Sequence, residues 1–108
     1  MDHDRKYRLK IRKEVMNHYG NKCNCCGEDT LEFLAIDHIN GKGNEHRRKI
    51  SPKNKGNTPS TVMYRWLIKN NYPDGFQILC HNCNVAKHHH GICPHKKILN
   101  SISSLLTV

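Results

Sequence analysis

Apolar residues near the start of the chain recur every four positions, as they do along one side of a helix. The stripe consists of Tyr7, Ile11, Val15 and Tyr19. It predicts an amphipathic helix over residues 4–19. Asp4 is suited to cap the first turn, and Gly20 is suited to end the helix.

A second helical stripe follows Thr58 and Pro59, which resemble an N-cap and a first helical position. Its apolar members are Val62, Met63, Trp66 and Leu67. The helix is expected to end near residues 70–71. We interpret Tyr64 and Trp66 as core residues and assign neither to DNA.

Two short apolar runs predict β-strands, one over residues 32–38 and one over residues 76–79. A turn over residues 72–75 precedes the second strand. A helix is expected from residue 82 to about residue 90, stopped by a glycine. Apolar residues in the tail predict a short packing helix there: Ile98, Leu99, Ile102, Leu105 and Leu106. Residues 40–57 are rich in Gly, Asn, Lys and Pro and predict a loop.

Composition favours a polyanionic partner. The net charge is +9, the pI is near 9.5, and the mean hydropathy is −0.78. Nucleic acid is the simplest such partner, although a merely basic protein is the alternative. The charge is clustered in two groups: Arg5, Lys6, Arg8, Lys10, Arg12 and Lys13, then Lys42, Arg47, Arg48, Lys49, Lys53 and Lys55.

Two Cys-x-x-Cys pairs, Cys23 with Cys26 and Cys80 with Cys83, have the spacing of one four-cysteine structural zinc site. So small and polar a domain often needs such support for its thin core. Free thiols or disulfides are the alternative. The charged start and the lack of an apolar signal-type run favour a reducing compartment. No apolar run approaches the roughly 18–20 residues of a membrane span.

Three metal-binding side chains are left over, namely Cys25, Cys93 and His95. Cys25 could replace Cys26 as a ligand, or these three, with or without His18, could form a second site. We favour ordinary buried or surface positions for them. The run His88-His89-His90 is interpreted as surface.

Asp37 and His38 end the first predicted strand, and Asn84 begins the helix after the second. Strand alternation would send Asp37 and His38 to opposite faces unless the strand end twists. Oxygen ligands from Asp37 and Asn84 suit a hard divalent ion such as Mg²⁺. Neutral His38 could deprotonate a water molecule for in-line attack, while the metal stabilises the phosphate and the leaving 3′ oxygen.

These residues carry a resemblance. Ile36-Asp37-His38-Ile39, Leu79-Cys80-His81-Asn82-Cys83-Asn84 and Lys87 resemble the HNH endonucleases, which are ββα-metal (His-Me finger) nucleases. Residues 19–28 and 91–95 resemble zinc-bearing HNH proteins of bacteriophages and phage-like elements. The similarity covers roughly residues 15–95.

The resemblance implies an α+β fold, with a β-hairpin and helix around one catalytic Mg²⁺ or Mn²⁺ ion. It implies His38 as general base, Asp37 and Asn84 as ligands of that ion, and DNA as the partner. The chain would be one domain, comprising a basic N-terminal helix over 1–22, a zinc-clamped ββα core with a long insert over 23–95, and a tail over 96–108. If phage-encoded, it would act in the bacterial host cytoplasm, and phage packaging, homing or restriction all fit.

The chain departs from the family pattern at two positions. Gly75 stands where many members have an Asn that braces the loop carrying the base, so another residue must brace that loop, and Asn82 is a candidate. Asn84 replaces the final His of the pattern but still offers an oxygen ligand.

The basic residues next to this site could hold phosphates. Arg47 and Arg48, with His46, follow the first strand, and Lys87 lies on the helix that bears Asn84. A solvated loop patch is the alternative. Two rival functions also stay open, namely a zinc module that binds nucleic acid without cutting it, and a structural interaction protein whose charge is incidental. The sequence does not indicate the DNA target or the oligomeric state.

Overall fold

The computed structural model describes residues 2–54 and 59–96. In this part of the chain a two-stranded antiparallel sheet lies among helices, which confirms a small α+β fold. The elements, in order, are α1 (Asp2–His18), η1 (Leu31–Phe33), β1 (Leu34–His38), α2 (Gly43–Ile50), η2 (Pro52–Asn54), α3 (Ser60–Lys69), β2 (Phe76–Cys80) and α4 (His81–His90).

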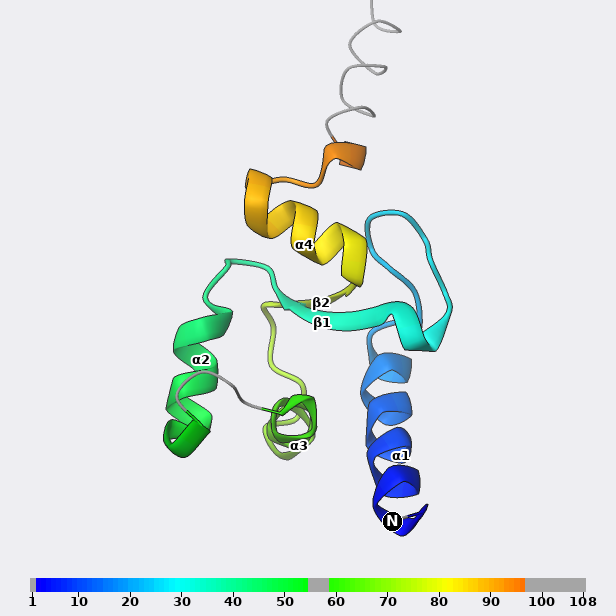
Figure 1. Cartoon of the computed structure of the whole chain (residues 1–108), viewed down its shortest axis with the longest axis vertical. Coiled ribbons are helices and arrows are strands. Elements are labelled where there is room, and N and C mark those ends of the chain that lie inside the picture. The colour runs from blue at the N-terminus through cyan, green and yellow to red at the C-terminus, as the bar shows by residue number, and fades with distance from the viewer. Residues whose placement is uncertain (1, 55–58, 97–108) are drawn as a thin grey trace, which may run out of the picture.

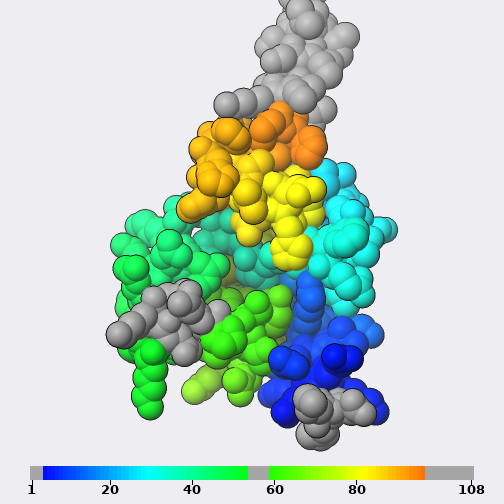
Figure 2. All heavy atoms as spheres, in the orientation of Figure 1, coloured from blue at the N-terminus to red at the C-terminus, as the bar shows by residue number. Residues whose placement is uncertain are grey.

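The sheet separates the helices into two groups (Figure 1). Helix α4 follows β2 without a break and packs against both strands, while α1, α2 and α3 lie on the other side of the sheet. The strands pair with Ile36 opposite Ile78 and Asp37 opposite Gln77. The space-filling view shows α4 lying across the strands (Figure 2). The end of β1 is therefore brought next to α4.

The core is formed where α1 and α3 meet the sheet. Its fully buried side chains include Val15, Met16, Leu34, Leu67 and Ile78. Burial of side chains of this size stabilises a fold by about 1.5–3 kcal/mol each. The core also contains four cysteines, so apolar packing and the cysteine cluster occupy one continuous interior.

Helix α1 differs in detail from its prediction. Tyr7 is 47% exposed, and Met16 is fully buried, so the stripe leading into the core is narrower than expected and shifted toward the C-terminal half. The helix begins at Asp2, which places Asp4 inside the first turn and not at the cap. Gly20, with a φ of +103°, follows the helix end as expected.

Helix α2 lies within residues 40–57, where the sequence predicted a loop, so that prediction was wrong. The segment buries no residue and carries no apolar stripe, which is the signal that sequence reasoning uses. It is supported instead by charges that match the helix dipole. Glu45 lies in the first turn, and three cationic residues lie in the last turn: Arg47, Arg48 and Lys49.

The remaining predicted elements agree with the structure to within a few residues. Helix α3 has the expected stripe, with Tyr64 buried and Trp66 packed against the core. The first strand starts later than predicted, because residues 31–33 form a 3₁₀ turn. The expected tail helix lies outside the described residues. No helix in the described part of the chain combines the length and apolar character needed to cross a bilayer.

Candidate functional site

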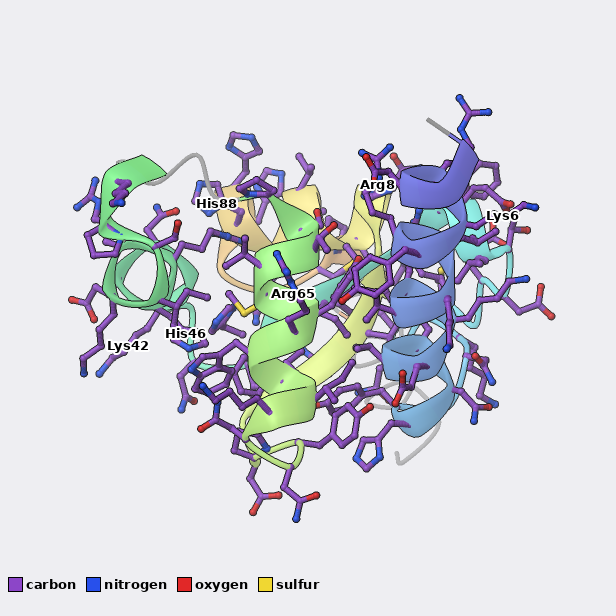
Figure 3. The ribbon with its side chains drawn as sticks, turned by 90° about the horizontal axis from the view of Figure 1, so that it is seen from below. Lys6, Arg8, Lys42, His46, Arg65 and His88 are labelled. Atoms are coloured by element: carbon purple, nitrogen blue, oxygen red, sulfur yellow. The ribbon has the colours of Figure 1, made fainter. Side chains whose placement is uncertain are left out.

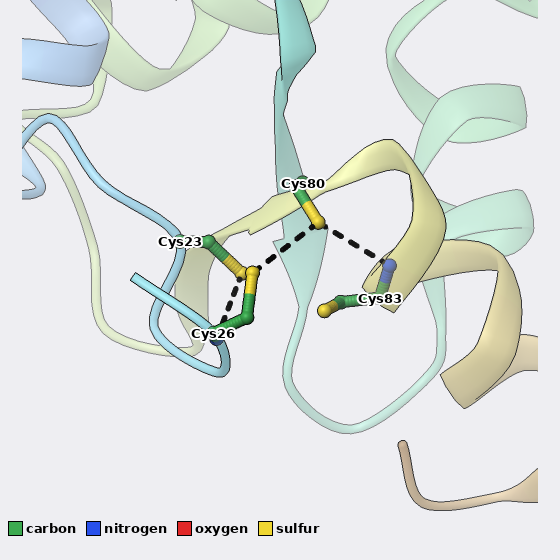
Figure 4. Close-up of side chains that lie close together, drawn as sticks. All are labelled: Cys23, Cys26, Cys80 and Cys83. Carbon is green, nitrogen blue, oxygen red and sulfur yellow. Dashed lines mark hydrogen bonds between the residues drawn. The ribbon is translucent and has the colours of Figure 1, made fainter. Parts of the chain in front are cut away.

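The two Cys-x-x-Cys pairs meet at one point (Figure 4). The sulfur atoms of Cys23, Cys26, Cys80 and Cys83 all lie within 4.8 Å of one another. The Sγ atoms of Cys26 and Cys80 are 3.7 Å apart, close to the edge of about 3.8 Å expected for a tetrahedron with zinc–sulfur bonds of about 2.3 Å. This cluster can hold a metal ion such as zinc.

Backbone amides donate to two of the four sulfurs, those of Cys23 and Cys80. Burial works against the thiolate of Cys23, yet backbone N–H groups around it outweigh burial and lower its pKa to about 6. Donors include the N–H groups of Cys25 and Cys26, at 3.4 and 3.5 Å. At the start of α4, the N–H of Cys83 donates to the sulfur of Cys80 at 3.5 Å. Thiolates are the form that binds zinc.

A cleft of about 560 Å³ lies where the end of β1 meets α2 and α4. Its lining includes Asp37, His38 and Asn84, the three residues that sequence analysis placed at the reactive site. Arg47 and Lys87 line it as well. His38 also borders a second hollow, toward α2 and α3, so its ring lies between the two spaces. Asp37 and His38 are the last two residues of β1, and both line this cleft although they are neighbours in the strand.

Asp37 is a buried carboxylate with two partners. It is 9% exposed, and its Oδ2 accepts hydrogen bonds from Lys87 Nζ at 2.6 Å and from Gln77 Nε2 at 2.9 Å. Neither bond uses Oδ1. An ammonium beside a carboxylate supplies the charge compensation that a buried anion needs.

Lys87 also fixes the loop that follows the strand. Its ammonium donates to the backbone oxygens of His38 and Ile39, at 3.1 and 3.0 Å. The N–H of Ile39 donates to the carbonyl of Gly75 at 2.9 Å. These contacts brace the loop that follows β1. Asn82, the candidate from sequence, is exposed on the first turn of α4.

The His38 ring is held from one side. Its Nε2 lies 2.8 Å from Nδ1 of His46, which is itself packed against Trp66. On the other side, a Cβ added at Gly43 would lie 3.1 Å from His38 Nδ1 and 3.2 Å from Arg47 Nη1. Burial, His46 and Arg47 lower the pKa of His38 to about 4, against the smaller opposing effect of Asp37. His38 is therefore neutral at physiological pH.

Two side-chain amides connect the cysteine cluster to the cleft through hydrogen bonds. Asn24, between the cysteines of the first pair, donates from its side chain to Gln77 Oε1 at 2.8 Å. Gln77 donates in turn to Asp37. The N–H of Asn24 also donates to the carbonyl of Ile78. The cysteine cluster and the carboxylate are thus parts of one connected framework.

The basic residues divide into structural and exposed ones. Arg12 is structural, because its Nη2 donates to the carbonyls of Leu31 and Leu34 at 2.9 and 3.0 Å. Arg48 is exposed and is not part of the cleft lining, whereas Arg47 is. Figure 3 shows exposed cations on two helices, with Arg8 on α1 and Arg65 on α3, and a third, Lys42, just before α2.

Sequence reasoning missed several residues at these sites. Gln77 and Gly43 were not singled out, although the pairing of Gln77 with Asp37 follows once the strand register is known. His88 and His89 are exposed, as expected, but they also line the cleft. His18 lies elsewhere, stacked on Tyr72. The other leftover residues gather around Cys83: Cys25, Cys93 and His95.

No protein-family model, curated protein or solved structure matches this chain.

Proposed function

We propose that this protein is a metal-dependent DNA endonuclease of the HNH type, with β1, β2 and α4 forming a ββα-metal arrangement. The observation that carries the proposal is the shared cleft. Asp37 and His38 lie on β1 and Asn84 lies on α4, yet all three line one cavity. A carboxylate and an amide can hold a divalent ion, and a neutral imidazole can act as a general base, so together these groups can serve metal-dependent hydrolysis of a phosphodiester.

The donor set fits a hard divalent cation. The Asp37 carboxylate and the Asn84 side-chain oxygen would hold Mg²⁺ or Mn²⁺, and two protein ligands leave room for water and phosphate oxygens. When bound, such an ion supplies charge stabilisation for the phosphate and the leaving oxygen. Oδ1 of Asp37 is the oxygen to assign to the ion, since both protein hydrogen bonds use Oδ2.

His38 would act as general base through Nδ1. We assign the hydrogen of the 2.8 Å contact to His38 Nε2, so that His46 accepts and His38 Nδ1, on the side of Gly43, keeps its lone pair. Its pKa near 4 keeps the ring neutral at pH 7. A bound phosphate would raise that pKa, because negative charge favours the imidazolium, and so would strengthen the base.

Arg47 and Lys87 would hold the phosphate. Both line the cleft, and a guanidinium can form two parallel hydrogen bonds to phosphate oxygens. The net charge of +9 and the exposed cations on α1, α2 and α3 would attract the rest of the DNA backbone.

The test is cleavage of supercoiled plasmid by zinc-loaded protein in Mg²⁺, Mn²⁺ or EDTA. The wild type should nick or linearise DNA only with the divalent ion. His38→Ala and Asn84→Ala should both lose this activity. His90→Ala is the matched control, because His90 is an exposed histidine of the same helix as Asn84 and lies outside the cleft lining. Equal cleavage by His38→Ala and His90→Ala would contradict the proposal.

A second candidate function is a nucleic-acid-binding module that does not cut. The contact between Lys87 and Asp37 favours it, because the carboxylate already has a cationic partner without a divalent ion. Well-folded protein that binds duplex DNA but leaves it intact in both Mg²⁺ and Mn²⁺ would select this function over the nuclease.

A further inference from the structure

Two groups of metal-binding side chains meet at a single sulfur. The first contains Cys23, Cys26, Cys80 and Cys83. The second contains Cys25, Cys83, Cys93 and His95. In each group the ligand atoms lie within 4.8 Å of one another, and Cys83 belongs to both. Cys83 is fully buried, and its sulfur lies within 4.8 Å of the ligand atoms of both groups.

The second group has the dimensions of a zinc site in its own right. Nδ1 of His95 lies 3.4 Å from the sulfur of Cys83, 3.4 Å from that of Cys93 and 3.8 Å from that of Cys25. A tetrahedral site with zinc–sulfur bonds of about 2.3 Å and a zinc–nitrogen bond of about 2.05 Å has sulfur-to-nitrogen edges of about 3.6 Å. The three distances bracket that value.

The ligand count explains why one sulfur is shared. Two separate tetrahedral sites need eight ligand atoms, whereas these groups contain seven different side chains, including all six cysteines of the chain. None of the six cysteines is in a disulfide. A thiolate has enough lone pairs to bind two cations. Filling only one site would leave two or three thiols packed together without a metal.

We infer that this protein binds two zinc ions in one cluster, with the Cys83 thiolate bridging them. Cys23, Cys26 and Cys80 complete the first site, and Cys25, Cys93 and His95 complete the second. Six thiolates and two Zn²⁺ ions leave a net charge of −2 on the cluster, within a strongly basic chain. The second ion joins the segment after α4 to the loop after α1. This inference does not depend on the proposed nuclease activity.

The first test is zinc stoichiometry by native mass spectrometry, with protein prepared under reducing conditions and desalted. The wild type should carry two zinc ions per chain. His95→Ala and Cys93→Ser should each carry one. One zinc in the wild type, or two in both variants, would overturn the inference.

Exposed histidines could bind zinc adventitiously, so a matched control is needed. The triple alanine variant of His88, His89 and His90 removes more imidazoles than His95→Ala but none from the cluster. It should keep two zinc ions. A drop to one would place the second ion on the histidine run and would also overturn the inference.

The bridge itself can be tested without altering Cys83, whose loss could prevent folding. Protein loaded with ¹¹³Cd in place of zinc should give two cadmium resonances that are coupled to each other through the shared sulfur. Substituting His95 should remove one resonance and the coupling. Two resonances without coupling would mean two independent ions and would contradict the bridge.

Discussion

His38 shows how one side chain depends on its neighbours on both sides. His46 holds one ring nitrogen, while Gly43 and Arg47 lie against the other. The sequence predicted that His38, Asp37 and Asn84 would come together, and the structure places them along one cleft. It could not predict the contact with His46, because that contact depends on the orientation of a helix that carries no apolar stripe.

The low pKa of His38 leads to a prediction about its titration. Burial and the nearby cations disfavour the imidazolium, so His38 should stay neutral from pH 7.5 down to pH 5.5. NMR of the imidazole carbons would measure its pKa. A His38 midpoint above 6 would contradict the structure.

The same shift has a consequence for stability, with a definite sign. The folded pKa lies below the unfolded value of about 6.5, so the unfolded chain binds the proton first. The contribution of His38 is fully present above pH 6.5 and is lost as the pH falls toward 4. The wild type should therefore lose stability relative to His38→Phe over that range.

Helix α2 is the element that sequence reasoning missed, and it carries the neighbours of His38. Strands β1 and β2 were predictable because short apolar runs are bounded by turns, whereas α2 buries nothing and resembles a polar loop in sequence. Helix α4 was predictable in position. The three hydrogen bonds that Lys87 donates, to Asp37, His38 and Ile39, were not predictable, because they depend on how α4 packs on the two strands.

Gly43, the first residue of α2, is expected to be sensitive to a single methyl group. An alanine Cβ would lie within 3.2 Å of both His38 and Arg47, so these side chains would have to move. If the protein is a nuclease, Gly43→Ala should slow cleavage by roughly tenfold to a hundredfold, because small displacements of catalytic groups are costly. Glu45→Ala, an exposed change in the same turn, should cleave normally. Full activity in Gly43→Ala would show that the ring position does not matter.

Lys87 makes a separate contribution to stability. Lys87→Met would leave the buried Asp37 carboxylate with Gln77 alone and two backbone oxygens without their donor. The free energy of unfolding should fall by about 1–3 kcal/mol. Urea denaturation of the zinc-loaded protein would measure it, with Lys10→Met, on the exposed side of α1, as the control. A loss equal to that of the control would mean that the brace is not needed.

At the scale of the whole molecule, the cysteine cluster and the apolar core form one interior. Four buried cysteines belong to the core, and Asn24 and Gln77 connect the cluster to Asp37. The Cys-x-x-Cys spacing was sufficient to predict that Cys23, Cys26, Cys80 and Cys83 come together in a cluster that can hold a metal ion. The sequence allowed a second site containing the leftover cysteines, but their gathering around Cys83 was not predictable, since it depends on where the segment after α4 meets the cluster.

Zinc removal should therefore unfold the protein. Zinc binding in small domains contributes about 10–16 kcal/mol, which equals or exceeds the net stability of about 5–15 kcal/mol typical of folded proteins. Circular dichroism after treatment with a strong zinc chelator should show loss of helix, and added Zn²⁺ but not Mg²⁺ should restore it. An unchanged spectrum and melting temperature in the metal-free protein would contradict this prediction.

The central claim is that His38 acts as the base in DNA cleavage. The most direct measurement is single-turnover cleavage of a labelled duplex in Mg²⁺, with binding to the same duplex measured in parallel for wild type and His38→Ala. We predict a rate loss of about 10²–10⁴-fold with unchanged affinity, the range expected for removal of a general base. Equal cleavage rates for the two proteins at equal affinity would contradict the account.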